Sequence, residues 1–375
     1  MREVELLIVG AGPAGLSAAC EAAKAGVQVM IIDENLRPGG QLFKQIHKFF
    51  GSRVHRAGTR GFRIGEMLLK ETEELGVEVQ LGYPVYGIFS ENHVLYGSRD
   101  GVKKLHAKKI ILATGANENN LCFEGSILPG VMTAGAAQTM INLHHVLPGQ
   151  KVVMVGSGNV GLIVSYQLLQ AGAEVVGLVE AAPAIGGYGV HANKLKRAGV
   201  PFYLSHTVQK VTGKDGVEKV ELVQLDQQFH PVPGTEKVLE ADTVCMAVGL
   251  TPMTELAELG GCEMTVSPAL GGVVPMHDDG MKTTNPDIYV AGDIAGVEEA
   301  STAMEEGRLA DSTISAETAA ESLGYLDKET AKEKQREIHE RLNLLRSGQF
   351  GSRRADAKAK IERDYEEWEE SGVQV

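Results

Sequence analysis

Short apolar runs that lead into glycine-rich turns recur along this chain. Val4–Val9 has the composition of a buried strand and runs directly into the turn GAGPAG at residues 10–15. A helical pattern over Leu16–Ala25 and a second apolar strand, Val27–Ile32, follow, and this strand ends at Asp33. Strand, glycine turn, helix, strand and terminal acid in this order predict a βαβ unit with parallel strands.

The same order of elements returns in the middle of the chain. The apolar strand Lys151–Val155 precedes the turn GSGNVG at residues 156–161, and a helix runs from there to Gln170. The strand Glu174–Val179 then ends at Glu180. The first glycine and the terminal acid are 23 positions apart in the first unit and 24 in the second. This repetition predicts two separate βαβ units and an α/β fold with two Rossmann-like domains.

Other strands and helices complete the expected organisation. Strand-like runs are expected at residues 77–81, 84–89, 93–96, 109–113, 202–204, 243–247 and 288–293, an antiparallel set at 208–238, and a helix at 301–321. The last fifty residues lack glycine-rich turns and carry dense mixed charge. Ile338, Leu342 and Leu345 share one face of an expected helix that stops near Gly348. Ala357, Ile361, Tyr365 and Trp368 mark the face of a second helix.

Composition and charge restrict the class of protein. The chain has 375 residues, enough for two domains with separate cores, and its 45 glycines indicate many tight turns. A net charge of −13 argues against a nucleic-acid partner, and no apolar run is long enough for a membrane span. The four cysteines are Cys20, Cys122, Cys245 and Cys262. They form no CxxC pair and no metal-ligand spacing, so we expect no metal site and a cytoplasmic location.

A glycine turn between strand and helix binds a diphosphate for a physical reason. The first glycine makes the turn, the second allows the backbone to approach the phosphates, and the third allows helix and strand to pack closely. The helix N-terminus directs free N–H groups at the anion. An acid at the end of the next strand can accept hydrogen bonds from ribose hydroxyls, so each unit predicts a dinucleotide site. Chance occurrence of glycine-rich turns is the competing interpretation.

Three distant segments establish a resemblance. They are ATGA at residues 113–116, AVGLTP at 247–252 and YVAGD at 289–293. Together with both glycine turns they resemble the flavoprotein family with two dinucleotide folds that includes thioredoxin reductase, over about residues 1–323. The resemblance implies that the first turn binds the FAD diphosphate and that the second binds NAD(P)H. It also implies that Asp293 bonds the flavin ribityl chain, and that the helix containing Ala303 and Gly307 faces the flavin.

The resemblance and the two turns together give a set of expected cofactor-binding residues. For FAD these are Gly10, Gly12, Pro13, Ala14, Gly15, Asp33, Glu34, Gly40, Gln41, Leu42, Val85, Ala113, Thr114, Gly115, Gly292, Asp293 and Ala303. For the nicotinamide nucleotide they are Gly156, Gly158, Asn159, Val160, Gly161, Glu180 and Gly249. The pair Gly39-Gly40 would let backbone run close to a flat ring system, and Gln41 could hydrogen-bond that ring. A plain loop is the alternative for this segment taken alone.

Departures from the family pattern change the expected activity. Thioredoxin reductase needs a CxxC pair, which this chain lacks, so we do not expect disulfide reduction. LPGVMTAGAAQ at residues 128–138 and EEASTAM at 298–304 resemble the FAD-containing α-subunit of dye-linked amino-acid dehydrogenases and of related amine- or opine-oxidising complexes. Many of those subunits end in a cysteine-rich extension that binds an iron–sulfur cluster. No cysteine follows Cys262 here, so electrons would leave the flavin to another subunit or a soluble acceptor.

Charge at the second turn favours NADH over NADPH. Glu180 would bond both ribose hydroxyls of NADH and repel a 2′-phosphate, and the following Ala181-Ala182-Pro183 supplies no cation. Lys44 and His47 lie close in sequence to the expected flavin edge and are the candidate catalytic residues, with His47 as a proton shuttle. Hydride transfer to flavin needs no protein base, so an ordinary loop histidine is an equal alternative.

These observations predict the domains and leave three functions open. The FAD domain is expected at residues 1–118 and 276–325, the NAD(H) domain at 119–275, and a charged helical tail at 326–375. The first function is the NADH-linked electron-transfer subunit of an amine or amino-acid dehydrogenase complex, with other subunits or an electron-carrier protein as partners. The second is a stand-alone NADH:acceptor reductase. The third is a flavin-bound assembly subunit without turnover.

Overall fold

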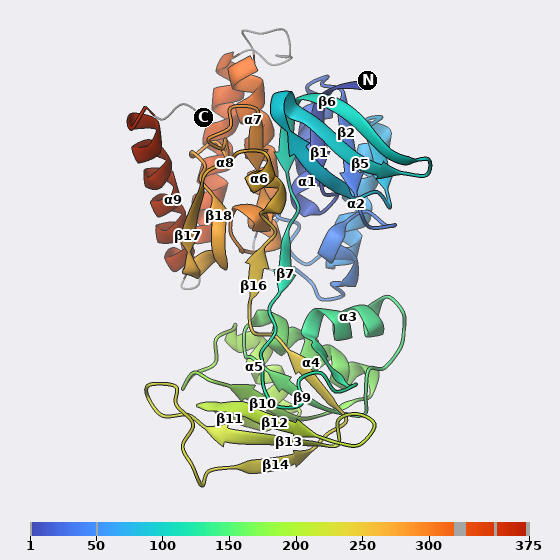
Figure 1. Cartoon of the computed structure of the whole chain (residues 1–375), viewed down its shortest axis with the longest axis vertical. Coiled ribbons are helices and arrows are strands. Elements are labelled where there is room, and N and C mark those ends of the chain that lie inside the picture. The colour runs from blue at the N-terminus through green and yellow to red at the C-terminus, as the bar shows by residue number, and fades with distance from the viewer. Residues whose placement is uncertain (1, 50–51, 319–327, 349–350, 373–375) are drawn as a thin grey trace. The chain divides into compact units, whose positions relative to one another are not determined.

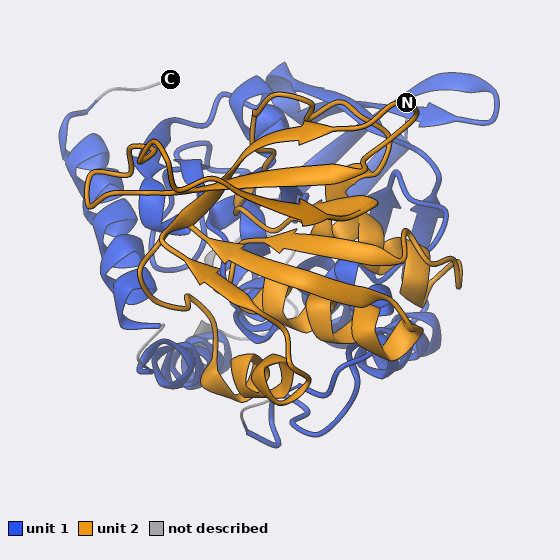
Figure 2. Ribbon diagram, turned by 90° about the horizontal axis from the view of Figure 1, so that it is seen from below, with its two compact units in different colours: residues 1–117, 251–375 blue, residues 118–250 orange. Residues whose placement is uncertain are grey.

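The chain divides into two compact units, one of which is inserted within the sequence of the other (Figure 2). The computed structural model describes residues 2–49, 52–318, 328–348 and 351–372. Unit 1 comprises residues 1–117 and 251–375, and unit 2 is the segment 118–250 inserted between them. The chain leaves unit 1 in β7 (Ala116–Glu118) and returns in β16 (Leu250–Pro252).

A seven-stranded sheet forms the centre of unit 1 (Figure 1). Its order is β3-β2-β1-β6-β5-β4, with β19 beside β6. The bounds are β1 (Arg2–Val9), β2 (Val29–Asp33), β3 (Glu78–Leu81), β4 (Val85–Phe89), β5 (His93–Ser98), β6 (Gly101–Leu112) and β19 (Ile288–Val290). Strands β3, β2, β1, β6 and β19 are parallel, whereas β4 and β5 form an antiparallel extension from β6. The carboxyl ends of β1, β6 and β19 therefore lie together at one edge of the sheet.

Small side chains let the helices of unit 1 pack closely on this sheet. Helix α1 (Pro13–Lys24) follows β1 directly and buries Ala14, Gly15, Ala18, Ala19 and Ala22. It packs along α7 (Ala300–Thr318), and α2 (Gly61–Glu74) covers its other side. A Cβ atom on Gly307 of α7 would lie 2.2 Å from the carbonyl oxygen of Ala14, so the two helices approach at backbone distance. Of the helix expected at 301–321, residues 319–321 lie outside the described part of the chain.

Unit 2 consists of a parallel sheet covered by helices on one face and by an antiparallel sheet on the other. The parallel order is β11-β10-β9-β15-β8, and β12, β13 and β14 form the second sheet. The strands are β8 (Val131–Thr133), β9 (Lys151–Val155), β10 (Glu174–Glu180), β11 (Phe202–Leu204), β12 (His206–Thr212), β13 (Lys219–Gln224), β14 (Lys237–Glu240) and β15 (Thr243–Met246). The helices are α3 (Ala134–Asn142), α4 (Asn159–Ala171) and α5 (Gly189–Arg197).

Alternating residues of β9 explain the layers of unit 2. Val152 and Met154 point into the core that α4 covers, whereas Val153 and Val155 point into the core shared with the antiparallel sheet. Successive strand side chains face opposite sides of a sheet, so an unbroken apolar run is buried on both faces. The expected fold class, two Rossmann-like α/β folds with a helical C-terminal segment, is confirmed.

The second crossing between the units lies earlier than the expected boundary at residue 275. Residues 251–275 form α6 (Glu255–Leu259) and the hairpin β17 (Met264–Ser267) and β18 (Gly272–Pro275), and they cluster with unit 1. Ala257 and Cys262 are buried in the core of unit 1, which fixes this segment there. Sequence pattern alone missed this because a short helix and a hairpin carry no signal of the core they join.

The charged tail also packs as part of unit 1. It forms α8 (Lys328–Arg346) and α9 (Ser352–Glu370), which lie alongside α7 and the β17–β18 hairpin in Figure 1. Ile338 and Leu342 enter the main core, while Ile361 packs against Leu270 and Val274. The apolar faces expected for the two helices therefore face unit 1.

Asp311 of α7 gives a testable pH dependence of stability. Its carboxylate is 1% exposed, neither oxygen has a hydrogen-bond partner among the described residues, and burial raises its pKa to about 7. The folded state therefore binds this proton more tightly than the unfolded state, and stability falls as pH rises from about 4 to about 7. We expect Asp311→Asn to add on the order of 3 kcal/mol at pH 8 and little at pH 4.5, measured as thermal unfolding at both pH values.

The exposed carboxylate of Asp279 supplies the control. Asp279→Asn should leave the melting temperature unchanged at both pH values. An equal effect of Asp311→Asn at pH 4.5 and pH 8 would show that Asp311 does not titrate as described.

Candidate functional site

The first glycine turn joins β1 to α1 and contains two positions that no other residue fits. Gly10 has φ +107°, and a Cβ atom placed on it would lie 2.3 Å from the carbonyl oxygen of Ala113. A Cβ atom on Gly15 would lie 2.0 Å from the carbonyl oxygen of Gly10. These two glycines therefore serve the packing of β1, β6 and α1.

Gly12 differs from the other two glycines of the turn. Its backbone is extended (φ −78°, ψ −173°), and a Cβ atom there would meet no protein atom within 4 Å. Gly12 is the N-cap residue of α1, so open space lies beside the end of the helix where free N–H groups attract an anion. The turn thus has the form of a diphosphate site, with a glycine where a ligand would approach.

Residues 39 and 40 lie directly against this turn. The backbone N–H of Gly39 donates to the carbonyl oxygen of Ala11 at 2.7 Å. A Cβ atom on Gly40 would lie 2.9 Å from the Cα atom of Gly12, and both Gly39 and Gly40 have positive φ. The segment RPGGQL is therefore held at the turn and is not an independent loop. Gln41 is exposed, whereas Leu42 is fully buried, so of these two residues Gln41 is the one that a ligand can reach.

A buried carboxylate holds the first turn from behind. Asp33, at the end of β2, accepts a hydrogen bond from the backbone N–H of Ala11 at its Oδ2 atom, at 2.6 Å. Its Oδ1 atom accepts from the backbone N–H of Asn35 at 2.7 Å. The side-chain amide of Asn35 donates to Oδ1 as well, at 2.9 Å, so it is Oδ2 that can accept a further hydrogen bond. Asp33 can therefore fix the turn and bind a ribose hydroxyl together.

The second turn repeats this geometry almost atom for atom. Cβ atoms on Gly156 and Gly161 would lie 2.2 Å from the carbonyl oxygen of Ala247 and 2.1 Å from that of Gly156, whereas one on Gly158 would meet nothing within 4 Å. Glu180, at the end of β10, accepts from the backbone N–H of Ser157 at 2.8 Å and from that of Ala182 at 2.9 Å. The two turns therefore have equivalent geometry in separate units.

Three further predicted residues of unit 2 are Asn159 and Val160, within the second turn, and Gly249. Asn159 begins α4, and its side-chain oxygen accepts from the backbone N–H of Tyr188 at 2.9 Å. Val160 is exposed. Gly249 has φ +110° and precedes the end of the inserted segment. None of these observations concerns a ligand, so Asn159, Val160 and Gly249 stay predictions as cofactor-binding residues.

Segments far apart in the sequence meet at the first turn. Gly292 follows β19, has φ +79°, and a Cβ atom there would lie 2.9 Å from the Cβ of Ala14 and 3.4 Å from the Cβ of Ala303. Burial, together with the carboxylates of Glu306 and Glu298, raises the pKa of the neighbouring Asp293 to about 6. The structure thus brings the AGD segment, the N-terminal part of α7 and the first turn together.

Other predicted residues lie at or near the same edge of unit 1. The hydroxyl of Thr114 donates to the carbonyl oxygen of Met253 at 2.7 Å. Gly115 has φ +81°, and a Cβ atom placed on it would meet no protein atom within 4 Å. Val85 is half-buried at the start of β4, and Glu34 is exposed after β2.

The contacts of the two candidate catalytic residues, Lys44 and His47, do not indicate a catalytic role. Lys44 ends the short 3₁₀ helix Gly40–Lys44 and is half-buried. His47 is half-buried too, and its ring stacks on that of Phe49 at a centroid distance of 6.0 Å. Both residues stay predictions.

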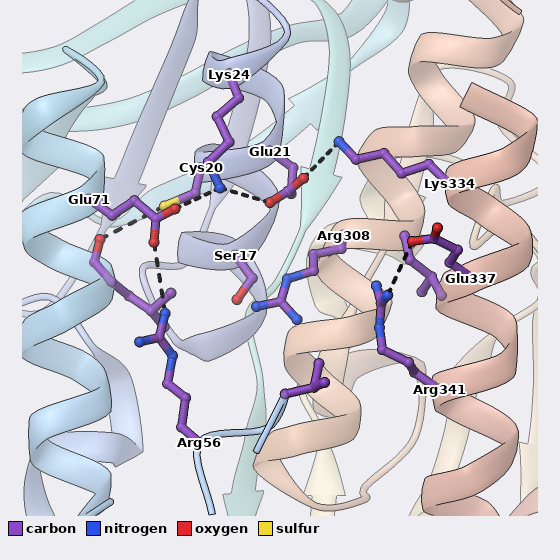
Figure 3. Close-up of a pocket in the computed structure, with 13 residues that line it drawn as sticks. Ser17, Cys20, Glu21, Lys24, Arg56, Glu71, Arg308, Lys334, Glu337 and Arg341 are labelled. Atoms are coloured by element: carbon purple, nitrogen blue, oxygen red, sulfur yellow. Dashed lines mark hydrogen bonds and ion pairs between the residues drawn. The ribbon is translucent and has the colours of Figure 1, made fainter. Parts of the chain in front are cut away.

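Sequence analysis missed a group of buried charges beneath α7. Glu305 is fully buried, and its carboxylate is 3.3 Å from His55, 2.5 Å from Arg308 and 2.9 Å from Arg341 of α8. Beside it lies a cavity of about 280 Å³ between α1, α2, α7 and α8, lined by charged side chains (Figure 3). Burial raises the pKa of Cys20 in this cavity to about 12, so its thiol stays protonated at neutral pH. The only hint of these buried charges in the sequence was the pair of adjacent acids, Glu305 and Glu306, within the expected helix.

With this geometry established, comparison with known proteins identifies the family. The sequence pattern described as pyridine nucleotide-disulphide oxidoreductase matches residues 4–307. The chain belongs to this family. The predicted resemblance is confirmed, and the chain is an oxidoreductase of a family that uses FAD and NAD(P)H.

Two curated relatives of this pyridine nucleotide-disulphide oxidoreductase are subunits of larger enzymes. The A-subunit of opine oxidase from Agrobacterium tumefaciens is 30% identical over 82% of this chain and 64% of its own length. The HcnB subunit of hydrogen cyanide synthase from Pseudomonas aeruginosa is 28% identical over 81% of this chain and 69% of its own length. The chain thus spans somewhat under two thirds of the opine oxidase polypeptide.

A solved structure shares the fold. Thioredoxin reductase of T. acidophilum superposes with a TM-score of 0.68 and 23% identity, over 83% of this chain and 97% of its own. Among the described residues, no helix has the length and apolar character to cross a membrane, and no group of three or more His, Cys, Asp or Glu side chains could hold a metal ion.

The open space at Gly12 and Gly158 predicts separable binding defects. An alanine at either position fits the protein, so Gly12→Ala should unfold at the wild-type temperature when no nucleotide is bound. It should nevertheless weaken FAD binding about tenfold or more, because the new methyl group occupies the space where a diphosphate approaches. Flavin fluorescence titration of the deflavinated protein measures this change.

Gly158→Ala is the matched variant in unit 2. It should weaken binding of the nicotinamide nucleotide and leave FAD affinity unchanged. If both variants bind both nucleotides as the wild type does, the turns are structural features only.

Proposed function

We propose that unit 1 binds FAD, that unit 2 binds NADH, and that the chain exchanges hydride between them while passing electrons to or from a partner polypeptide. One observation carries this proposal: both units contain the same turn, with an open central glycine and a carboxylate that fixes the backbone behind it. A single glycine turn is common, but two with the same hydrogen bonds indicate two nucleotides.

The residues of unit 1 fit FAD in three respects. The space beside Gly12 suits the diphosphate, Asp33 retains acceptor capacity for the adenosine ribose, and the partly exposed Asp293 can accept from a polyol hydroxyl. When bound, FAD supplies a ring that accepts a hydride and releases electrons one or two at a time. The chain's own residues orient the cofactor and exclude water, and they need not move a proton.

Unit 2 has the charge that favours NADH. Glu180 is anchored by Ser157 and Ala182, so its negative charge has a fixed position at the end of β10. A 2′-phosphate placed there would meet this carboxylate at close range, which is unfavourable in a partly buried site. Neither Ala181 nor Ala182 can neutralise that phosphate.

The cysteines support electron transfer without disulfide chemistry. All four are free thiols, and Cys20, Cys245 and Cys262 are buried. Burial raises the pKa of Cys245 to about 12, which leaves no thiolate to attack a disulfide at neutral pH. The exposed Cys122 lacks the second cysteine that a dithiol cycle requires.

A role within a complex is supported by the names of the relatives. The opine oxidase and hydrogen cyanide synthase relatives are both named as subunits, and the match covers most of this chain. We therefore propose that the chain is the electron-transfer α-subunit of an amine or amino-acid dehydrogenase complex, whose substrate is bound by another polypeptide.

Anaerobic mixing with NADH tests the proposed electron transfer. The flavin-loaded protein should lose the visible absorbance band of oxidised flavin. A flavin that stays oxidised would favour an assembly role without turnover. Native purification from the source cell should then recover a second dehydrogenase subunit, whereas recovery of the chain alone with full NADH:acceptor activity would favour a stand-alone reductase.

Charge reversal at Glu180 tests the nucleotide preference. Glu180→Arg should change the ratio of kcat/KM for NADH to that for NADPH by about tenfold or more towards NADPH, because a cation replaces the repelling carboxylate. The measurement is steady-state reduction of an artificial dye with each nucleotide.

A second variant keeps the hydrogen bonds of Glu180 intact. Ala181 is exposed, so Ala181→Arg adds a cation beside the site without removing the support of the turn, and it should raise NADPH activity with a smaller loss of NADH activity. Unchanged preference in both variants would remove Glu180 from the nucleotide site.

A further inference from the structure

Glu306 of α7 connects the tail to the loop that carries Asp293. Its side chain is 1% exposed. The Oε2 atom accepts a hydrogen bond from the backbone N–H of Gly292 at 3.0 Å. The Oε1 atom lies 2.7 Å from Nη2 of Arg346 in α8 and 2.7 Å from Nζ of Lys358 in α9. One buried carboxylate thus binds the start of the loop and both tail helices.

Lys358 also binds the other end of the same loop. Its Nζ atom, in a side chain that is 3% exposed, donates to the carbonyl oxygen of Ala295 at 2.9 Å. The Nε atom of Arg346 lies 3.1 Å from the carboxylate of Glu298, just beyond the loop. The residues 292–295 are therefore held at their first N–H through Glu306 and at their last carbonyl through Lys358.

Burial makes these contacts mutually dependent. Burial alone would raise the pKa of Glu306, but Lys358 and Arg346 lower it by more, so the carboxylate is ionised. A buried charge that loses its partner is strongly destabilising, so removal of either cation leaves Glu306 incompletely compensated. The geometry of the loop consequently depends on side chains more than fifty residues further along the chain.

We propose that α8 and α9 hold the flavin loop, residues 292–295, in its binding geometry, with Arg346 and Lys358 as positioning residues for FAD. The inference rests on the proposed FAD site in unit 1. It assigns a role in cofactor binding to the tail, which lies outside the segment that matches the family, residues 4–307. Neither cation needs to touch the cofactor, because each acts through the backbone of residues 292–295.

The charges around Asp293 make the proposal testable by pH. Asp293, with a pKa of about 6, faces Glu306 and Glu298, which raise its pKa, and Lys358, which lowers it. The nearby buried His277, whose pKa burial lowers to about 4, is neutral above that pH, and Arg346 remains paired with both glutamates. Loss of the Lys358 charge should therefore raise the pKa of Asp293.

The direct test is FAD titration of the deflavinated full-length protein between pH 5 and pH 8, compared between wild type and Lys358→Met. An ionised Asp293 is the better acceptor for a ribityl hydroxyl, so wild-type affinity should fall as pH drops through about 6. Lys358→Met should bind FAD about tenfold more weakly at pH 7.5, and the midpoint of its pH dependence should move to higher pH.

Lys360→Met is the matched control on the same helix. Lys360 is half-exposed, and its Nζ atom pairs with Asp364 at 2.6 Å, so the substitution leaves the loop contacts in place. This control should retain wild-type affinity and midpoint, and Lys358→Arg should restore much of both. Equal affinity and an equal midpoint in Lys358→Met and wild type would overturn the positioning role.

A double variant covers the case in which Lys358→Met does not fold. Glu306→Gln combined with Lys358→Met removes one charge of each sign and leaves Arg346 paired with Glu298. It should fold and bind FAD weakly, whereas wild-type affinity in this variant would also overturn the inference. Failure of the wild-type chain itself to bind FAD would instead contradict the proposed function of unit 1.

Discussion

A hydrogen bond from the backbone of a glycine turn to a carboxylate determines the form of both candidate sites. Asp33 accepts from Ala11, and Glu180 accepts from Ser157, in each case across the gap between two parallel strands. This bond holds the backbone of the turn in place. In that conformation the space beside Gly12 and Gly158 stays free of protein atoms. Because the same carboxylate also lies where a ribose would bind, it can both stabilise the turn and bind the ligand.

The surrounding structure supports the first of these turns from unexpected parts of the chain. Ala14, Gly292 and Ala303 meet because all three are small, and Glu306 then binds the backbone of Gly292. The ionisation of Glu306 depends in turn on cations from α8 and α9. The tail, with its mixed charge, is therefore part of the support of the site, although its sequence resembles an ordinary solvated helix pair.

The sequence predicted the two βαβ units well because local spacing determines them. Gly10 and Gly156 precede their acids by nearly equal intervals, and the strands and helices follow from apolar periodicity. The boundary at residue 250 and the role of Lys358 could not be predicted in this way. Both depend on which distant core a short segment joins, and a lysine buried against Glu306 has the same local pattern as an exposed one. The proposal of Lys44 and His47 as catalytic residues shows a second limit of sequence analysis. Both residues are close in sequence to an expected site, but that closeness does not show that they have a function there.

If both turns are nucleotide sites, the isolated chain must bind two nucleotides independently. Equilibrium titration of the deflavinated protein with FAD, followed by NAD⁺, which has no hydride to transfer to the flavin, tests this most directly. We predict one equivalent of FAD, then one equivalent of NAD⁺ that does not displace the flavin. Failure to take up FAD, or competition of the two nucleotides for one site, would contradict the central claim.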